Sequence, residues 1–178
     1  AKIPISNSLN LDVTINPDFS QVEVDRQVTN LTRFSIFFPE KRNFFIENSD
    51  LFDRYGFRQI RPFFSRRIGL DNGEVVPIYG GIRLSGKINK NWRIGLMNMQ
   101  TAESKKTGLP AENFGVFALQ RTVFIRSNVA FIFVNRESFS TATATATYNR
   151  IAGLDYNLNS ADNKWFGKAF LHYSFNPV

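Results

Sequence analysis

The chain has 178 residues, enough to bury the core of one domain without a disulfide or a metal ion. It contains no cysteine, which excludes a disulfide framework, a cysteine-based zinc site and thiol chemistry. The formal net charge of +7 suits nucleic acid, an anionic lipid surface or an acidic ligand. Because most basic residues are scattered singly and no nucleic-acid motif is present, we exclude nucleic acid as a partner.

The first predicted strand runs from Leu9 to Ile15, where apolar and polar side chains alternate until the pattern stops before Pro17. From residue 17 to residue 73 the alternation is lost and phenylalanines cluster. They are Phe34, Phe37, Phe38, Phe44, Phe45, Phe63 and Phe64. We interpret residues 17–73 as a compact insert whose own strands the pattern does not assign.

A hairpin follows the insert. Between Ile78 and Ile88 apolar side chains alternate with polar ones, and the same alternation resumes from Trp92 to about Thr101. The polar tripeptide 89–91 separates the two segments and is typical of a tight turn. We therefore expect two antiparallel strands of about 10 residues here.

Four further strands repeat this pattern. They are expected at about Asn113 to Arg121, Asn128 to Arg136, Tyr148 to Leu158 and Lys164 to Phe175. A tilted strand needs about 9 to 11 residues to cross an outer membrane, whereas strands of soluble proteins average about 5 or 6. The expected lengths therefore favour membrane-crossing strands.

The expected connections alternate between short and long. The short ones lie at about 89–91, 122–126 and 159–163, and the long ones at about 102–112 and 137–147. Outer-membrane barrels combine tight periplasmic turns with longer extracellular loops. We therefore expect the strand that begins near Val75 to descend to the periplasm and the strand from Trp92 to rise again.

Aromatic residues near the strand ends point to the same architecture. Trp92, Tyr148, Tyr156, Trp165, Tyr173 and Phe175 would lie at the two membrane interfaces. We predict an all-β chain, the N-terminal part of an antiparallel transmembrane β-barrel, with residues 1–178 in one barrel domain. Residues 17–73 would lie in the lumen or cap one mouth. The alternative is a soluble β-sandwich, because alternation alone does not distinguish lipid from a protein core.

Basic residues supply the first candidate site. Arg54, Arg58, Arg61, Arg66 and Arg67 form the densest basic patch, and Arg83 and Lys87 lie on the polar face of an expected strand. Guanidinium groups bind phosphate and carboxylate oxygens through two parallel hydrogen bonds, so this patch is a candidate for anionic sugar or lipopolysaccharide groups. The alternative, which we favour, is pairing with acidic residues inside a polar lumen.

Acidic residues supply the second candidate site. Asp18, Glu23 and Asp25 lie close together in the sequence, but their spacing matches no calcium-binding loop. We interpret them as lumen-facing charges. They also support a rival hypothesis, a carbohydrate-active hydrolase that uses Glu23 and Asp25, since glycoside hydrolysis needs two carboxyl groups.

His172 is the one histidine of the chain, and we expect it to be a polar strand residue on the lumen side. No nucleophile elbow, phosphate-binding loop or dinucleotide glycine pattern is present in the sequence. We therefore predict no catalytic residues, no metal and no cofactor, and a protein that is not an enzyme.

Several longer segments carry a family resemblance. They are N-P-D-F-S-Q-V-E-V-D (Asn16 to Asp25), N-L-T-R-F-S-I-F-F-P-E-K-R-N-F-F-I-E (Asn30 to Glu47), F-S-R-R-I-G (Phe64 to Gly69), P-I-Y-G-G-I-R-L-S-G-K (Pro77 to Lys87), E-N-F (Glu112 to Phe114) and Y-N-R-I-A-G-L-D-Y-N-L (Tyr148 to Leu158). In these segments the chain resembles a family of Gram-negative outer-membrane proteins of unknown function that usually follows a carbohydrate-binding module similar to family 9.

The resemblance implies a signal peptide, then the carbohydrate-binding-like module, then a barrel of which this chain would be an early part. It supplies no established catalytic residues. We expect a location in the outer membrane of a Gram-negative bacterium and a passive role in transport, envelope assembly or glycan handling. The expected partners are outer-membrane lipid or lipopolysaccharide, other outer-membrane proteins and glycan. The rival hypotheses are the outer-membrane carbohydrate-active hydrolase and a soluble β-sandwich that binds a partner.

Overall fold

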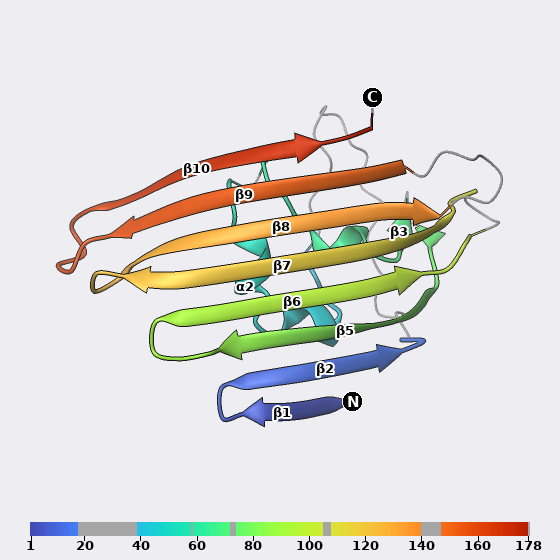
Figure 1. Cartoon of the computed structure of the whole chain (residues 1–178), viewed down its shortest axis with the longest axis horizontal. Coiled ribbons are helices and arrows are strands. Elements are labelled where there is room, and N and C mark those ends of the chain that lie inside the picture. Colours follow the sequence, from blue (N-terminus) through green and yellow to red (C-terminus); the bar gives the residue numbers. More distant parts are fainter. Residues whose placement is uncertain (18–38, 58, 72–73, 105–107, 140–146, 178) are drawn as a thin grey trace.

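The computed structural model of the chain describes residues 1–17, 39–57, 59–71, 74–104, 108–139 and 147–177. Its main element is one antiparallel sheet of eight strands in the order β1-β2-β5-β6-β7-β8-β9-β10 (Figure 1). The strands are β1 (Lys2–Ser6), β2 (Leu9–Ile15), β5 (Ile78–Lys87), β6 (Trp92–Thr101), β7 (Ala111–Val123), β8 (Ser127–Phe139), β9 (Thr147–Asn159) and β10 (Phe166–Phe175). The chain is therefore all-β in its main architecture.

The described part of the insert covers one face of this sheet (Figure 1). It contains the short helices α1 (Asn43–Ile46), α2 (Asp50–Asp53) and η2 (Ser65–Arg67) and the strand β3 (Leu70–Asp71). β3 pairs with β4 (Glu74–Val75), which comes directly after the insert, in a separate two-stranded sheet. We call the covered face the inner face and the opposite face the outer face. No helix in the described part of the chain is long and apolar enough to cross a membrane.

The buried core lies between the insert and the inner face. The insert contributes Phe45, Leu51, Phe52, Tyr55, Phe63 and Ile68, and the sheet contributes Met97, Met99, Phe114, Val116, Ala118, Ala130, Ile132 and Val134. The sheet residues follow the two-residue period, because every second side chain of β6, β7 and β8 points to the same face. Helix α2 packs against β6 and β7 at the centre of this core.

The structure confirms the opening strand, the hairpin and the four later strands expected from the sequence, and it changes their bounds. β7 and β8 each have 13 residues and are longer than expected, while β10 begins at Phe166 rather than Lys164. The sequence analysis missed β1, which pairs with β2. Proline at position 4 weakens the strand pattern there, and this edge strand tolerates it because an edge leaves one row of backbone groups unpaired.

The short and long connections lie at opposite ends of the sheet (Figure 1). Residues 88–91, 124–126 and 160–165 make the short connections, while residues 16–77, 102–110 and 140–146 make the long ones. This confirms the alternation expected from the sequence. Of the long connections, residues 18–38, 58, 72–73, 105–107 and 140–146 lie outside the described part of the chain. We call the two ends of the sheet the short-turn end and the long-loop end.

The eight strands form one open antiparallel sheet that is not closed into a barrel. β1 and β10 form its two edges and do not pair with each other. A closed barrel of about eight strands has an interior just wide enough for its own side chains. Here the inner face packs against the insert, and the eight strands do not close around that insert.

The close approach of α2 to β6 depends on Gly95. A Cβ atom added at Gly95 would lie 2.7 Å from the Phe52 ring, which is closer than atoms normally approach. We predict that Gly95→Ala lowers the free energy of unfolding by about 1–3 kcal/mol, because the Phe52 ring must move in a tightly packed core. Urea unfolding followed by tryptophan fluorescence measures this change.

Gly115→Ala is the matched control. A Cβ atom at Gly115 would meet its nearest neighbour at 3.8 Å, an ordinary contact distance. The control variant should unfold at nearly the same urea concentration as the unmodified chain. Equal stability of the two variants would show that Phe52 does not pack on β6 as described.

Candidate functional site

The outer face carries an uninterrupted apolar row across all eight strands. Cross-strand register aligns Tyr173, Ala152, Phe133, Phe117, Leu96, Leu84, Leu11 and Ile3 from β10 to β1. A second row of Leu171, Leu154, Phe131, Leu119 and Ile94 runs beside it from β10 to β6. We call these two rows the outer apolar band. Leu154 is 51% exposed and Leu171 is 75% exposed, so nothing in the described chain covers this band.

Polar side chains border the band toward the long-loop end. Asn98 and Asn113 exchange two hydrogen bonds of 2.9 and 3.1 Å through their side-chain amides. On β8 and β9, Arg150 Nε donates to Asn135 Oδ1 at 2.9 Å, and its guanidinium lies over the Tyr148 ring. The outer face therefore changes from apolar to polar along each of these strands.

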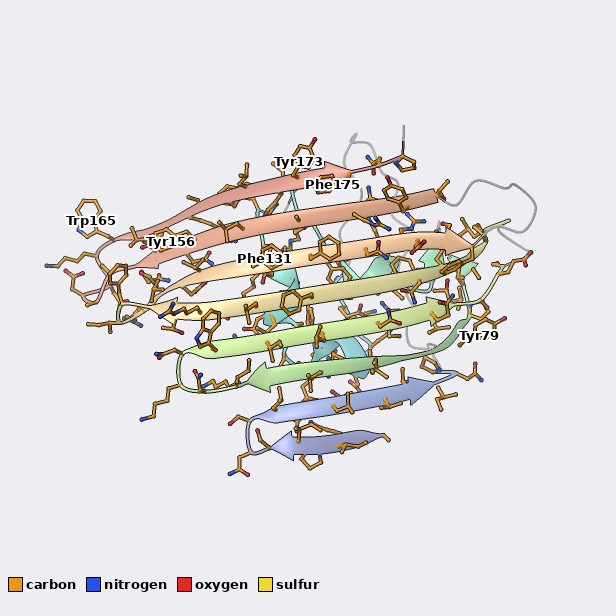
Figure 2. The ribbon with its side chains drawn as sticks, in the orientation of Figure 1. Tyr79, Phe131, Tyr156, Trp165, Tyr173 and Phe175 are labelled. Atoms are coloured by element: carbon orange, nitrogen blue, oxygen red, sulfur yellow. The ribbon has the colours of Figure 1, made fainter. Side chains whose placement is uncertain are left out.

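Aromatic residues lie near both ends of the sheet (Figure 2). Trp165 and Tyr156 lie toward the short-turn end, and Tyr79 lies at the long-loop end. Trp92 also lies at the short-turn end, where Arg121 packs over its indole ring at 5.3 Å. Tyr173 departs from the expected interface position, because the register places it in the apolar row.

The inner face carries the ion pairs. Arg83, expected to face the lumen, is 1% exposed and donates to Asp12 Oδ2 at 2.8 Å. Its second terminal nitrogen donates to the backbone oxygen of Glu47 at 2.7 Å, which joins β5 to the insert. Lys87, the other candidate on β5, is exposed.

The arginines of the basic patch do not form one cluster. Arg54 and Arg61 line a pocket described below, Arg67 is exposed, and Arg66 is buried with Nη1 donating to Pro39 O at 2.6 Å. Arg58, together with the acidic candidates Asp18, Glu23 and Asp25, lies outside the described residues. The four described arginines therefore do not share one site.

Asp155 is a buried anion that the sequence analysis missed. It is fully buried on the inner side of β9 and accepts a hydrogen bond from the backbone nitrogen of Gly56 at 2.8 Å. His172 Nε2 lies 2.7 Å and Lys168 Nζ 3.1 Å from its carboxylate oxygens. The alternation of β9 and β10 places all three side chains on the inner face, but only the register shows that they meet.

Arg42 and Glu112 are two further buried charges that the sequence analysis missed. Arg42 donates to both carboxylate oxygens of Glu40 and to the backbone oxygens of Ile68 and Ser65, at 2.6 to 2.8 Å. Burial by itself would raise the pKa of Glu40, but the hydrogen bonds and charge of Arg42 lower it overall. Glu112 accepts from Arg136 at 2.6 Å. These pairs hold the insert and the inner face in place.

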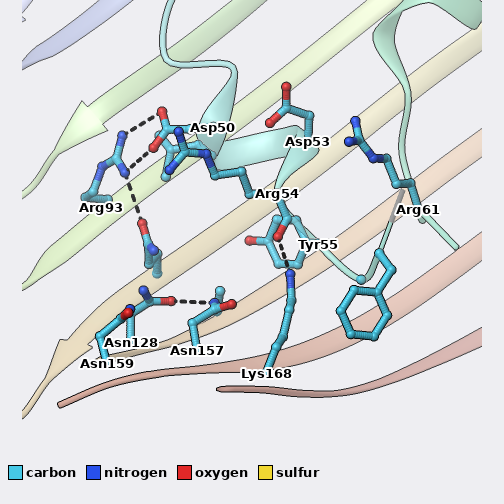
Figure 3. A pocket seen from close by; sticks show the side chains of 15 residues that line it. Asp50, Asp53, Arg54, Tyr55, Arg61, Arg93, Asn128, Asn157, Asn159 and Lys168 are labelled. Carbon is cyan, nitrogen blue, oxygen red and sulfur yellow. Dashed lines mark hydrogen bonds and ion pairs between the residues drawn. The ribbon is translucent and has the colours of Figure 1, made fainter. Parts of the chain in front are cut away.

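A polar pocket opens between α2 and the short-turn end of the inner face (Figure 3). Its volume is about 600 Å³. Its charged lining residues are Asp50, Asp53, Arg54, Arg61, Arg93 and Lys168, and its amide lining residues are Gln120, Asn128, Asn157 and Asn159. We call this cavity the amide pocket.

The two carboxylates of the amide pocket titrate differently. The hydrogen bond from Arg93, at 2.6 Å, lowers the pKa of Asp50. Burial raises the pKa of Asp53. No group of three or more histidine, cysteine, aspartate or glutamate side chains in the described part of the chain is placed to hold a metal ion. The pocket is therefore a polar cavity with charged walls.

Comparison with known proteins identifies one family. A family described as a domain of unknown function (DUF5916) matches residues 1–176. No curated protein and no solved structure matches the chain. The description of this family names neither a location nor a ligand.

The buried Asp155 carboxylate should be a main contributor to the stability of the insert on the sheet. We predict that Asp155→Asn lowers the free energy of unfolding by about 2–4 kcal/mol, because it leaves the Lys168 ammonium without its counter-charge in a partly buried place. Urea unfolding measures the loss. Asp162→Asn, which alters an exposed pair with Lys164, is the control and should leave the unfolding midpoint nearly unchanged. A similar midpoint for both variants would refute the structural role of Asp155.

Proposed function

The chain belongs to the DUF5916 family, whose description names no function, and from the geometry of the sheet we propose that it forms part of the wall of an outer-membrane β-barrel. The outer apolar band carries this proposal. It crosses all eight strands, it is exposed, and no described segment covers it. Exposed apolar surfaces of this extent are rare on soluble proteins and mark contact with a membrane or a partner.

Strand length supports contact with a membrane. The strands β5 to β10 have 10, 10, 13, 13, 13 and 10 residues. About 9 to 11 residues are needed for a tilted strand to cross a bilayer. The polar border at the long-loop end and the aromatic residues at both ends fit the head-group regions on either side of the hydrocarbon layer.

The distribution of charge between the two faces of the sheet supports an arrangement in which the outer face contacts lipid and the inner face lines the lumen. The ion pairs of Arg83, Asp155 and Glu112 lie on the inner face, which the proposed arrangement turns away from lipid. The insert would lie inside the lumen, and further strands would pair with the open edges of β1 and β10 to enclose it. Because an unpaired edge in a bilayer leaves backbone groups without hydrogen bonds, closure by more strands is required in this arrangement.

The proposed activity is passive. Charged groups on the inner face would select among small solutes, and the insert would narrow the passage. Transport, envelope assembly and glycan handling are all compatible with a wall of this kind. The proposed surroundings are outer-membrane lipid or lipopolysaccharide on the outer face, in a Gram-negative bacterium.

Fractionation tests the proposal. The full-length protein should be in the membrane fraction and should require detergent for extraction. On a gel, the unboiled protein should migrate faster than the boiled protein, because closed barrels resist the detergent until heated. A protein that stays in buffer without detergent and shows no mobility shift would refute the membrane wall and favour the soluble β-sandwich.

A charge on the outer apolar band tests its contact with lipid. A lysine on the lipid-facing side of a barrel costs about 2–4 kcal/mol at mid-membrane and about 0–1 kcal/mol near the interface. We therefore predict that Leu154→Lys lowers the fraction of heat-modifiable protein in membranes. Asn98→Lys, on the polar border of the same face, should preserve most of it. Equal folded fractions for the two variants would contradict a lipid-facing band.

A further inference from the structure

The amide pocket has the size and position of a ligand site. Its volume of about 600 Å³ falls within the range of small-molecule sites, which is about 300–1,000 Å³. One wall comes from α2 and the segment that follows it, and the other comes from strands β6 to β10. The lining is rigid on the sheet side, where Asn157 Nδ2 donates to Asn128 Oδ1 at 2.9 Å across the β8–β9 pair.

The charges of the pocket favour an anion. Arg54, Arg61, Arg93 and Lys168 supply four positive charges, against the two lining carboxylates of Asp50 and Asp53 and the Asp155 carboxylate that pairs with Lys168. The Asp50 carboxylate is bound in two hydrogen bonds to Arg93, at 2.6 and 3.1 Å. The Lys168 ammonium donates a hydrogen bond to the backbone oxygen of Arg54 at 2.6 Å. It also forms an ion pair with Asp155, which is buried beside the pocket and does not line it.

Arg54 is the cation best placed to receive a ligand. Its side chain is exposed and lies in the pocket (Figure 3). Among the described residues its guanidinium forms no hydrogen bond and no ion pair within 4 Å, unlike Arg93, although it acts electrostatically on both Asp50 and Asp53. A guanidinium presents several donors in one plane and matches the two oxygens of a carboxylate or phosphoryl group.

The remaining lining groups are suited to a hydroxylated body. Gln120, Asn128, Asn157 and Asn159 present amide donors and acceptors without net charge. Phe57 is 55% exposed and its ring packs edge-on against Phe170 at 5.3 Å, which adds an apolar surface beside the amides. Neutral polar groups next to an apolar ring fit hydroxyl groups and the carbon skeleton that carries them.

We propose that the amide pocket binds a small organic oxyanion, a carboxylate or phosphoryl group on a hydroxylated body, with Arg54 as its main anionic contact. The site lies on the inner face, opposite the outer apolar band. The proposed ligand site therefore does not depend on the proposed role of the chain as part of a membrane barrel wall. Fractionation tests the wall, and ligand titration tests the pocket.

Calorimetric titration of the full-length protein, in detergent where extraction requires it, tests the site with three probes. D-glucuronate carries a carboxylate on a hydroxylated ring, D-glucose carries the ring alone, and inorganic phosphate carries the oxyanion alone. Glucuronate should bind saturably and at least about tenfold more tightly than glucose, because a hydrogen-bonded charge contributes more than a neutral contact. Tighter binding of phosphate than of glucuronate would support the oxyanion site and assign a phosphoryl group to it.

Arg54→Gln should weaken the binding of the preferred anion by about tenfold or more. Because Arg54 is exposed and makes no ion pair with a described residue, the variant should unfold at the same temperature as the unmodified protein. Lys87→Gln is the matched control: it removes an exposed cation of the same sheet that does not line the pocket. The affinity of Lys87→Gln for the preferred anion should equal that of the unmodified protein.

Three results would overturn the site. They are the absence of saturable binding for both anions, binding of glucose that is as tight as that of the preferred anion, and an equal loss of affinity in Arg54→Gln and Lys87→Gln. The last result would show that the anion responds to the net charge of the protein rather than to this pocket.

Discussion

The strict alternation of side chains along a β-strand is the constraint on which the rest of this structure depends. In eight antiparallel strands held in register, it sorts the residues into two unlike faces. The inner face packs against the insert through Phe52 and Met97, and the outer face leaves Leu154 and Leu171 exposed. A shift of one residue in any strand would exchange the two sets of side chains, so the apolar outer row and the buried ion pairs depend on the same register.

The buried charges of the inner face are paired with charged side chains of neighbouring strands and hydrogen-bonded to backbone groups of the insert. Arg83 bridges β5, β2 and the backbone at Glu47, and Asp155 joins β9 and β10 to the backbone at Gly56. Removing a charge from water is costly unless a partner of opposite charge and further hydrogen bonds replace the water. The insert and the sheet therefore stabilise each other, because each supplies hydrogen-bond partners to polar groups that the other buries.

The two faces support separate proposals. In the first proposal the outer apolar band contacts lipid, and in the second the amide pocket binds a small anion that approaches from the inner side. If both hold, the chain presents a ligand site to the interior of a barrel whose wall it helps to build. The insert then has two roles, because α2 both fills the space beside the sheet and forms one wall of the pocket.

The sequence alone determined the strands from Leu9 to Ile15 and from Ile78 onward, since a two-residue period and polar turns are local properties that need no tertiary contacts. It also placed Arg83 and His172 on the polar face. It did not determine β1, the helices of the insert, the open edges of the sheet, or the partners of Arg83 and Asp155. Those features depend on contacts between residues that are far apart in the sequence. Arg83 and Asp12 are 71 positions apart, and Gly56 and Asp155 are 99 positions apart. Only the tertiary structure decided them, because register and packing between distant segments, rather than any local pattern, bring such groups together.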